Sequence, residues 1–141
     1  MDGTQMANDI ERPRGDSEKI TINLGAIDLG QVDLLVREAF YSNRSDFIRT
    51  AIRNQLLTHA EVVRQTVQRK TMVLGLRHYD RAELEAARET GQPLTIQVLG
   101  LASIASDVSA ELARAAISSV QVLGMFQADP AIKTALADRI R

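Results

Sequence analysis

The chain has 141 residues, of which 25% are charged and 45% hydrophobic, and its formal net charge is -1, so it has the composition of an ordinary globular protein. It contains no cysteine and only two histidines, which excludes disulfides, thiolate catalysis, cysteine zinc sites and a histidine-rich metal site. No apolar run reaches the length of a membrane span and the acidic N-terminus is unlike a signal peptide, so we expect a cytoplasmic protein without membrane contact.

Residues 1–18 are expected to form a disordered arm. They contain five acidic residues against two arginines, together with Pro13 and Gly15, and they show no apolar period. The predicted domain organisation starts after this arm, with an N-terminal head at residues 19–60, a helical linker at 61–71 and a C-terminal domain at 72–141.

The stretch Lys19–Leu24 alternates apolar and polar residues, which predicts a short β-strand. Its apolar side would carry Ile20, Ile22 and Leu24, and its polar side Lys19, Thr21 and Asn23. The next strand candidate lies near residue 72, and a lone short strand is not stable in water. We therefore expect this strand to pair with its own copy from a second subunit.

Two helices are predicted after the strand. The first covers about Leu29–Ala39, with Asp28 as its cap and Gln31 completing a capping box. The second opens at Asn43, with Asp46 at the reciprocal position of its own box, and its pattern continues past residue 60.

This unit of about 40 residues is too small to bury an adequate core alone. The orphan strand and the small size together predict an intertwined dimer, with one two-stranded antiparallel ribbon above four helices. The apolar positions expected to form the dimer core are Ile20, Ile22, Leu24, Val32, Leu35, Val36, Phe47, Ile48, Ala51 and Ile52.

The opening of the second helix reads Asn43-Arg44-Ser45-Asp46-Phe47-Ile48-Arg49, and KITINL precedes it at a distance of about 20 residues. This combination resembles the ribbon-helix-helix family, and more narrowly its CopG-type transcriptional regulators, over residues 19–58. One departure is Ala39, where the family often has a glycine between the helices. If the backbone has a positive φ there, alanine carries a cost; the turn could instead use Tyr41 or Ser42 differently.

The resemblance implies that the dimeric ribbon enters the major groove of double-stranded DNA. It makes Lys19, Thr21 and Asn23 the expected base contacts, and Ser42, Asn43, Arg44 and Ser45 the expected phosphate contacts. The alternatives without a role in binding are that the strand residues form only the solvent-exposed face of an amphipathic strand and that Asn43 only caps its helix. Arg49 and Arg53 are weaker phosphate candidates, because pairing with Asp33 or Glu38 is an equal alternative.

The second half contains an internal repeat in which Val73–Leu76, Val98–Leu101 and Val122–Met125 place glycines at the same position. Each repeat predicts a short strand, buried on both faces and followed by a helix, so the strands should be parallel. The helices are expected at Arg81–Thr90 and Ala110–Ala116, and from Pro130 to about Ile140. The arrangement could be a small three-layer stack or a short solenoid. The predicted fold class is thus α+β: a ribbon-helix-helix head followed by a βα-repeat domain of three short parallel strands.

No catalytic constellation or cofactor motif stands out, so we expect no enzyme and no cofactor. His78 and Asp80 lie close together without a nucleophile, and the resemblance to CopG-type proteins does not extend to metal sensing, because cysteine ligands are absent. The leading hypothesis is a sequence-specific transcriptional regulator, acting as a repressor. The alternative is the antitoxin of a toxin–antitoxin pair with the same head. The C-terminal domain would serve oligomerisation beyond the homodimer, or sensing.

Overall fold

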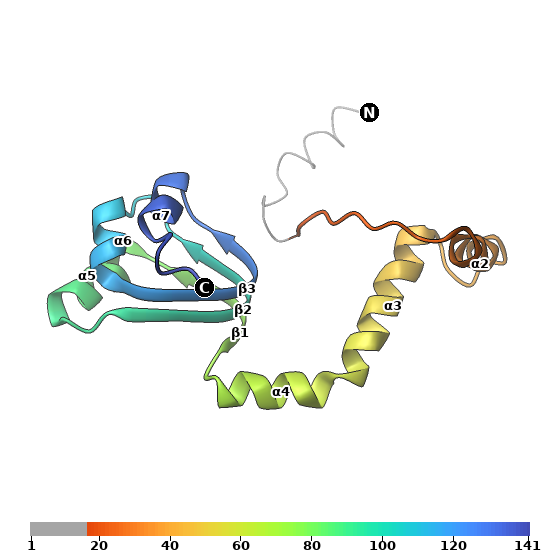
Figure 1. Cartoon of the computed structure of the whole chain (residues 1–141), viewed down its shortest axis with the longest axis horizontal. Coiled ribbons are helices and arrows are strands. Elements are labelled where there is room, and N and C mark those ends of the chain that lie inside the picture. Colours follow the sequence, from red (N-terminus) through yellow and green to blue (C-terminus); the bar gives the residue numbers. More distant parts are fainter. Residues whose placement is uncertain (1–16) are drawn as a thin grey trace. The chain divides into compact units, whose positions relative to one another are not determined.

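The computed structural model describes residues 17–141 (Figure 1). Most of the expected N-terminal arm, residues 1–16, lies outside this range. Contacts divide the described chain into an N-terminal unit, Lys19–Gln68, and a C-terminal unit that contains Arg69–Arg141. This part of the chain has six helices and one three-stranded parallel sheet, which gives an α+β architecture. None of the helices between residues 17 and 141 has the length and apolarity needed to cross a membrane.

The N-terminal unit consists of three helices, which are α2 (Ala26–Arg37), α3 (Arg44–Thr58) and α4 (Ala60–Arg69). The start of α3 is as predicted, with Asn43 at its N-cap. The predicted continuation past residue 60 forms α4, a separate helix that begins after the α3 cap at His59.

The predicted cap of α2 is wrong. The helix starts at Ala26 because Gly25, in an extended conformation, occupies the N-cap, and Asp28 lies inside the first turn without capping it. A carboxylate in the first turn still interacts favourably with the positive end of the helix dipole. Gln31, expected to complete the box, instead donates to the Ile27 carbonyl at 3.4 Å.

The turn between α2 and α3 places Ala39 in the left-handed conformation, with φ of 65°. The N–H of Phe40 donates to the Leu35 carbonyl and that of Ala39 donates to the Val36 carbonyl, both at 3.0 Å. This pair of bonds is the Schellman motif, which usually has glycine at the left-handed position. The alanine therefore keeps the backbone geometry that favours glycine and carries its steric cost.

Residues 17–24 form neither helix nor strand in the single chain that the structure describes. Ile20 is 76% exposed and Ile22 61% exposed. A strand is defined by hydrogen bonds to a neighbour, so the antiparallel ribbon stays a prediction that concerns two chains.

The C-terminal unit is a parallel sheet in the order β1-β2-β3, with strands β1 (Val73–Tyr79), β2 (Leu94–Ile104) and β3 (Ile117–Gln127). Helices α5 (Arg81–Thr90) and α6 (Ala110–Ala116) connect the strands, and α7 (Pro130–Ala135) follows the last one. The parallel direction and the positions of α5 and α6 agree with the sequence-based expectation. Asp80 caps α5 and Ser109 caps α6.

The three repeats lie in register across the sheet. Gly75 pairs with Gly100 and Gly100 pairs with Gly124, so the glycines form one column perpendicular to the strands. All three have positive φ, between 118° and 137°, and the strands bend midway along their length (Figure 1). A Cβ on Gly100 would lie 2.2 Å from the Gly75 carbonyl oxygen, and one on Gly124 would lie 2.2 Å from that of Gly100. The column therefore depends on glycine for both its conformation and its close approach.

The core of the C-terminal unit lies between the sheet and the helices. Alternate residues of β2, such as Ile96, Val98, Ala102 and Ile104, are buried against it, together with Leu84 of α5 and residues of α6 and α7. The opposite surface of the sheet exposes leucines. The prediction that the strands are buried on both faces is therefore wrong for the single chain, because the helices cover one surface only.

The last helix is shorter than predicted and ends at Ala135. Beyond it, the chain returns to the edge of β3: the N–H of Val120 donates to the Arg139 carbonyl at 2.9 Å, and the N–H of Arg141 donates to the Val120 carbonyl at 2.8 Å. The Arg139 guanidinium also donates to the Ile117 carbonyl at 2.6 Å. These bonds tie the C-terminal residues to β3 where a last helical turn was predicted.

Candidate nucleic-acid interface

The start of α3 is organised by Asp46. Its N–H donates to Asn43 Oδ1 at 2.8 Å, while its carboxylate accepts from the N–H and the hydroxyl of Ser42 at 3.0 and 2.9 Å. The reciprocal bond thus reaches Ser42, one residue before the position that a standard capping box uses. The Ser42 N–H and hydroxyl, aided by nearby Arg53 and Arg49, hold the pKa of Asp46 below its usual value.

A consequence for the predicted phosphate set is that the Ser42 hydroxyl and the Asn43 side-chain oxygen already serve the cap. Other donors at this end are the backbone N–H groups of Arg44 and Ser45, since the first N–H groups of a helix have no partner within it. They point out of a helix of 15 residues, at the positive end of its dipole.

Arg44 forms a two-pronged ion pair with Asp33 of α2. Its Nε donates to Oδ1 at 2.7 Å and its Nη2 donates to Oδ2 at 2.8 Å. The pair lies on the surface, and it lowers the pKa of Asp33 through the hydrogen bonds from Arg44 and raises that of Arg44 in turn. In the single chain, the guanidinium of Arg44 occupies both oxygens of Asp33. Pairing of Arg49 or Arg53 with Asp33 or Glu38 within a dimer stays a prediction.

Five charged side chains therefore gather around the start of α3. Arg44, Arg49 and Arg53 are positive, while Asp33 and Asp46 are negative, which leaves a local net charge of 3 − 2 = +1. Arg49 and Arg53 are exposed and act on Asp46 through space. The arrangement can attract an anion, although one of its three cations is engaged by Asp33.

An aromatic pair supports the turn before α3. The rings of Tyr41 and Phe47 meet edge to face, with centroids 5.0 Å apart and planes at 84°, a geometry that aromatic quadrupoles favour. Sequence reasoning assigned Phe47 to the core but missed its contact with Tyr41, and it missed the role of Asp33. The spacing of residues along one helix reveals neither contact, because the two partners lie in different segments. Asp33, for example, lies 11 residues before Arg44.

The predicted base contacts lie in the segment before α2. Lys19, Thr21 and Asn23 are all exposed, and so are the apolar residues between them. The structure thus leaves this whole stretch without an internal partner surface, while the phosphate candidates sit at the structured start of α3.

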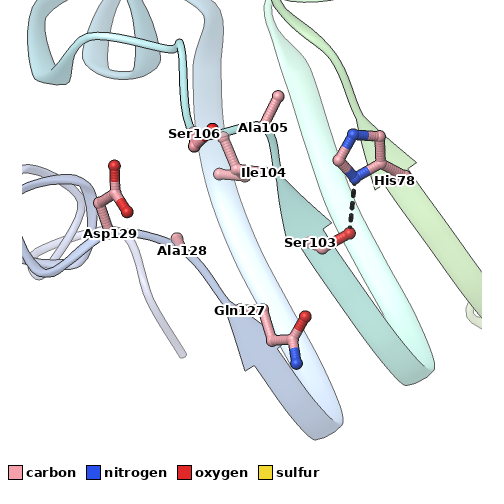
Figure 2. A pocket seen from close by; sticks show the side chains of 8 residues that line it. All are labelled: His78, Ser103, Ile104, Ala105, Ser106, Gln127, Ala128 and Asp129. Atoms are coloured by element: carbon pink, nitrogen blue, oxygen red, sulfur yellow. Dashed lines mark hydrogen bonds between the residues drawn. The ribbon is translucent and has the colours of Figure 1, made fainter. Parts of the chain in front are cut away.

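A second candidate site lies in the C-terminal unit, at the carboxyl ends of the three strands (Figure 2). A shallow cavity of about 460 Å³ is lined by His78, Ser103, Ile104, Ala105, Ser106, Gln127, Ala128 and Asp129. His78 Nδ1 and Ser103 Oγ are 2.7 Å apart and lie at paired positions of β1 and β2. Ligands often bind at this end of parallel strands. Among residues 17–141 no cluster of three or more acidic or histidine side chains could hold a metal ion.

Comparison with known proteins adds one match. The family model of the Ribbon-Helix-Helix transcriptional regulator family matches residues 15–133, which cover the N-terminal unit and most of the C-terminal unit. No curated protein and no solved structure matches the chain. The match extends far beyond residues 19–58, so the C-terminal sheet is part of the same family pattern.

Proposed function

Since this chain belongs to the ribbon-helix-helix transcriptional regulator family, we propose that it binds specific DNA sites as a homodimer and represses transcription. In this proposal residues 19–60 are the DNA-binding domain and 61–71 its helical linker. Residues 72–141 form a separate domain that serves oligomerisation or sensing.

The observation that carries the homodimer in this proposal is the small number of buried side chains in the N-terminal unit. Val32, 6% exposed, is the one buried hydrophobic residue between Lys19 and Gln68. The expected core residues Ile20, Ile22, Leu24 and Ile52 are all more than 40% exposed. Burying one such side chain is worth about 1.5–3 kcal/mol, so this unit gains its stability when a second copy covers it.

Several exposed residues extend the predicted dimer core. Ile27, Leu34, Phe40, Leu56 and Leu57 are each more than half exposed. Ile27 and Leu34 lie two turns apart on α2, on a different side from Val32, so α2 has apolar residues on two sides. This pattern supports an intertwined dimer, in which each helix contacts its own chain and its partner.

Within that dimer, the strands from the two chains would form an antiparallel ribbon with Lys19, Thr21 and Asn23 on its outer face. These side chains have the donors and acceptors to read base edges in the major groove. The first turn of α3, with Ser42, Asn43, Arg44 and Ser45, would contact the phosphates beside the ribbon.

The test compares two variants on two duplexes, a fragment from the region upstream of the protein's own gene and a random duplex of equal length. Asn23→Ala should reduce the preference for the specific duplex. Arg44→Ala should weaken binding to both and flatten the dependence on salt by about one phosphate contact. Fluorescence polarisation between 50 and 300 mM salt measures both effects. Equal affinity of the native protein for the two duplexes at physiological salt would refute sequence-specific binding.

The dimer itself is tested by mixing chains with two different tags. Exchange followed by co-purification should yield mixed dimers, and analytical ultracentrifugation at micromolar concentration should detect no folded monomer. A folded monomer at that concentration contradicts the proposed intertwined core.

An antitoxin with the same head is the second candidate. Toxin partners usually bind a short, disordered or helical tail, whereas the C-terminal unit here is an ordered sheet with three helices. This difference favours the regulator. Co-purification of a small toxic partner from the native host would favour the antitoxin.

A further inference from the structure

The sheet of the C-terminal unit exposes an apolar ridge on the surface that faces away from its core. The ridge, here called the leucine ridge, is formed by the residues on either side of the glycine column: Leu74, Leu76, Leu99, Leu101, Leu123 and Met125. Leu74, Leu76 and Leu123 are 62%, 77% and 53% exposed, and the other three are half-buried. The patch is on the order of a few hundred Å², which is the size of the largest apolar patch on a typical monomer, and such patches are often functional.

Polar rows border the ridge at both ends, in register with the strands. Gln97 pairs with Gln121 on one side, and His78, Ser103 and Gln127 pair on the other. The ridge contains no charged residue, and the nearest strand cation, Arg77, is bonded to Glu83 of α5 at 3.1 Å on the core side. An apolar centre with a polar rim is the anatomy of a protein–protein interface.

The chemistry of the ridge fits a second copy of itself. A two-fold interface brings the same patch of both chains together, so a charged patch would repel its copy, whereas an uncharged apolar patch complements itself. Residues 1–16 are poor candidates to cover the ridge, because they combine six charged residues with few apolar ones. The exposed apolar residues of the N-terminal unit are used in its own proposed dimer.

The size of the patch indicates whether the second copy belongs to the same dimer or to another dimer. A stable interface between separate proteins buries about 800 Å² on each partner, and the ridge offers less. Two chains that are already joined are held at an effective concentration on the order of millimolar, at which a small interface suffices. We propose that the leucine ridge packs against the ridge of the partner chain within the same dimer. The proposal rests on the homodimer described above.

Because the chain contains no cysteine, single introduced thiols report proximity cleanly. The probe is a short bismaleimide, applied to the full-length protein carrying Leu101→Cys at the centre of the ridge. Ala86→Cys, on the exposed side of α5, is the matched control, and Thr21→Cys reports the ribbon. We expect Leu101→Cys to crosslink into dimers at least about tenfold faster than Ala86→Cys, at a rate independent of protein concentration.

A second substitution tests the contact itself. Adding Leu76→Glu to Leu101→Cys should slow the crosslink to the control rate, because it places like charges in an apolar interface, while adding Ala86→Glu should not. Circular dichroism should show both variants folded, since Leu76 and Ala86 are exposed.

The outcomes separate the two proposals. If Thr21→Cys crosslinks and Leu101→Cys stays at the control rate, the ridge contact is wrong and the ribbon dimer stands. If Leu101→Cys crosslinks and Thr21→Cys does not, the ribbon is wrong. Crosslinking that rises with protein concentration, together with a tetramer mass, places the contact between dimers and overturns the proposal as stated.

Discussion

Arg44 at the start of α3 donates two hydrogen bonds to the Asp33 carboxylate of α2, at 2.7 and 2.8 Å. A carboxylate and a phosphate present similar paired oxygens to a guanidinium. Asp33 therefore holds Arg44 in a geometry that a phosphate could also provide. Under the proposed contact of Arg44 with DNA, the two anions would compete for one cation.

We predict that Asp33→Asn strengthens binding to specific and random duplexes alike, by up to about fivefold, and steepens the salt dependence by about one phosphate contact. The reason is that Arg44 no longer has to leave a carboxylate before it meets DNA. Fluorescence polarisation across a salt series measures the change. Asp28→Asn, which removes the same charge from the same helix, controls for net charge. Equal gains in the two variants, or weaker binding by Asp33→Asn, would show that the pair does not compete with DNA.

Acid should destabilise the N-terminal unit through Asp33 and Asp46. Both carboxyl groups have a lowered pKa in the folded protein, because Arg44 and Ser42 respectively donate hydrogen bonds to them. A lowered native pKa contributes stability above the unfolded value of about 3.9, and that contribution is lost as pH falls through the native pKa. Urea unfolding followed by circular dichroism at pH 7, 4 and 3 should show the loss. The Asp33→Asn, Asp46→Asn double variant should lose less, and an unchanged loss would place the acid sensitivity elsewhere.

The glycine column yields a prediction with an internal control. Gly100→Ala should destabilise the C-terminal unit by about 2–6 kcal/mol, because backbone strain of about 1–3 kcal/mol adds to a clash with the Gly75 carbonyl. Gly75 has a similar positive φ, but open space surrounds the position of a Cβ there in Gly75→Ala. This substitution should therefore cost only the strain. Urea denaturation gives both values, and a larger effect at Gly75 than at Gly100 would contradict the observed packing.

Ala39→Gly should stabilise the N-terminal unit by about 0.5–1 kcal/mol. Ala39 has φ of 65°, which costs a non-glycine residue about 1–2 kcal/mol, and the extra chain entropy of glycine offsets part of the gain. Thermal unfolding of the full-length protein provides the measurement. Ala51→Gly in the middle of α3 should have the opposite sign, because glycine weakens a helix interior by about 1 kcal/mol. A loss of stability in both variants would indicate that the turn does not carry strain.

Patterns that repeat locally predicted much of the fold. The repeated Val-Leu-Gly segments predicted parallel strands, and the capping pair of Asn43 with Asp46 located the start of α3. The start of α2 was missed because Gly25 begins this helix without a side-chain cap. The end of α7 was missed because the hydrogen bonds between residues 139–141 and β3 follow no local sequence pattern.

The candidate site was predicted less fully than the fold. Residue types placed Arg44 at the start of α3, but its partner Asp33 depends on how α2 and α3 cross, which no local pattern encodes. The apolar runs of the strands indicated burial on both faces, and the single chain covers only one. Under the proposed ridge contact, a partner chain would cover the second face, and that burial involves two chains.

The glycine column also constrains how the sheet can misalign. If β2 slipped along β1 by two residues, Gly75 would lie opposite Val98 or Ala102, and the positive-φ positions of the two strands would no longer lie side by side. Each pair of neighbouring strands is thus aligned at the position where their glycines lie side by side. Parallel pairing forms slowly, because its contacts join residues far apart in the sequence. The glycine column reduces the number of registers that the strands can adopt while the sheet forms.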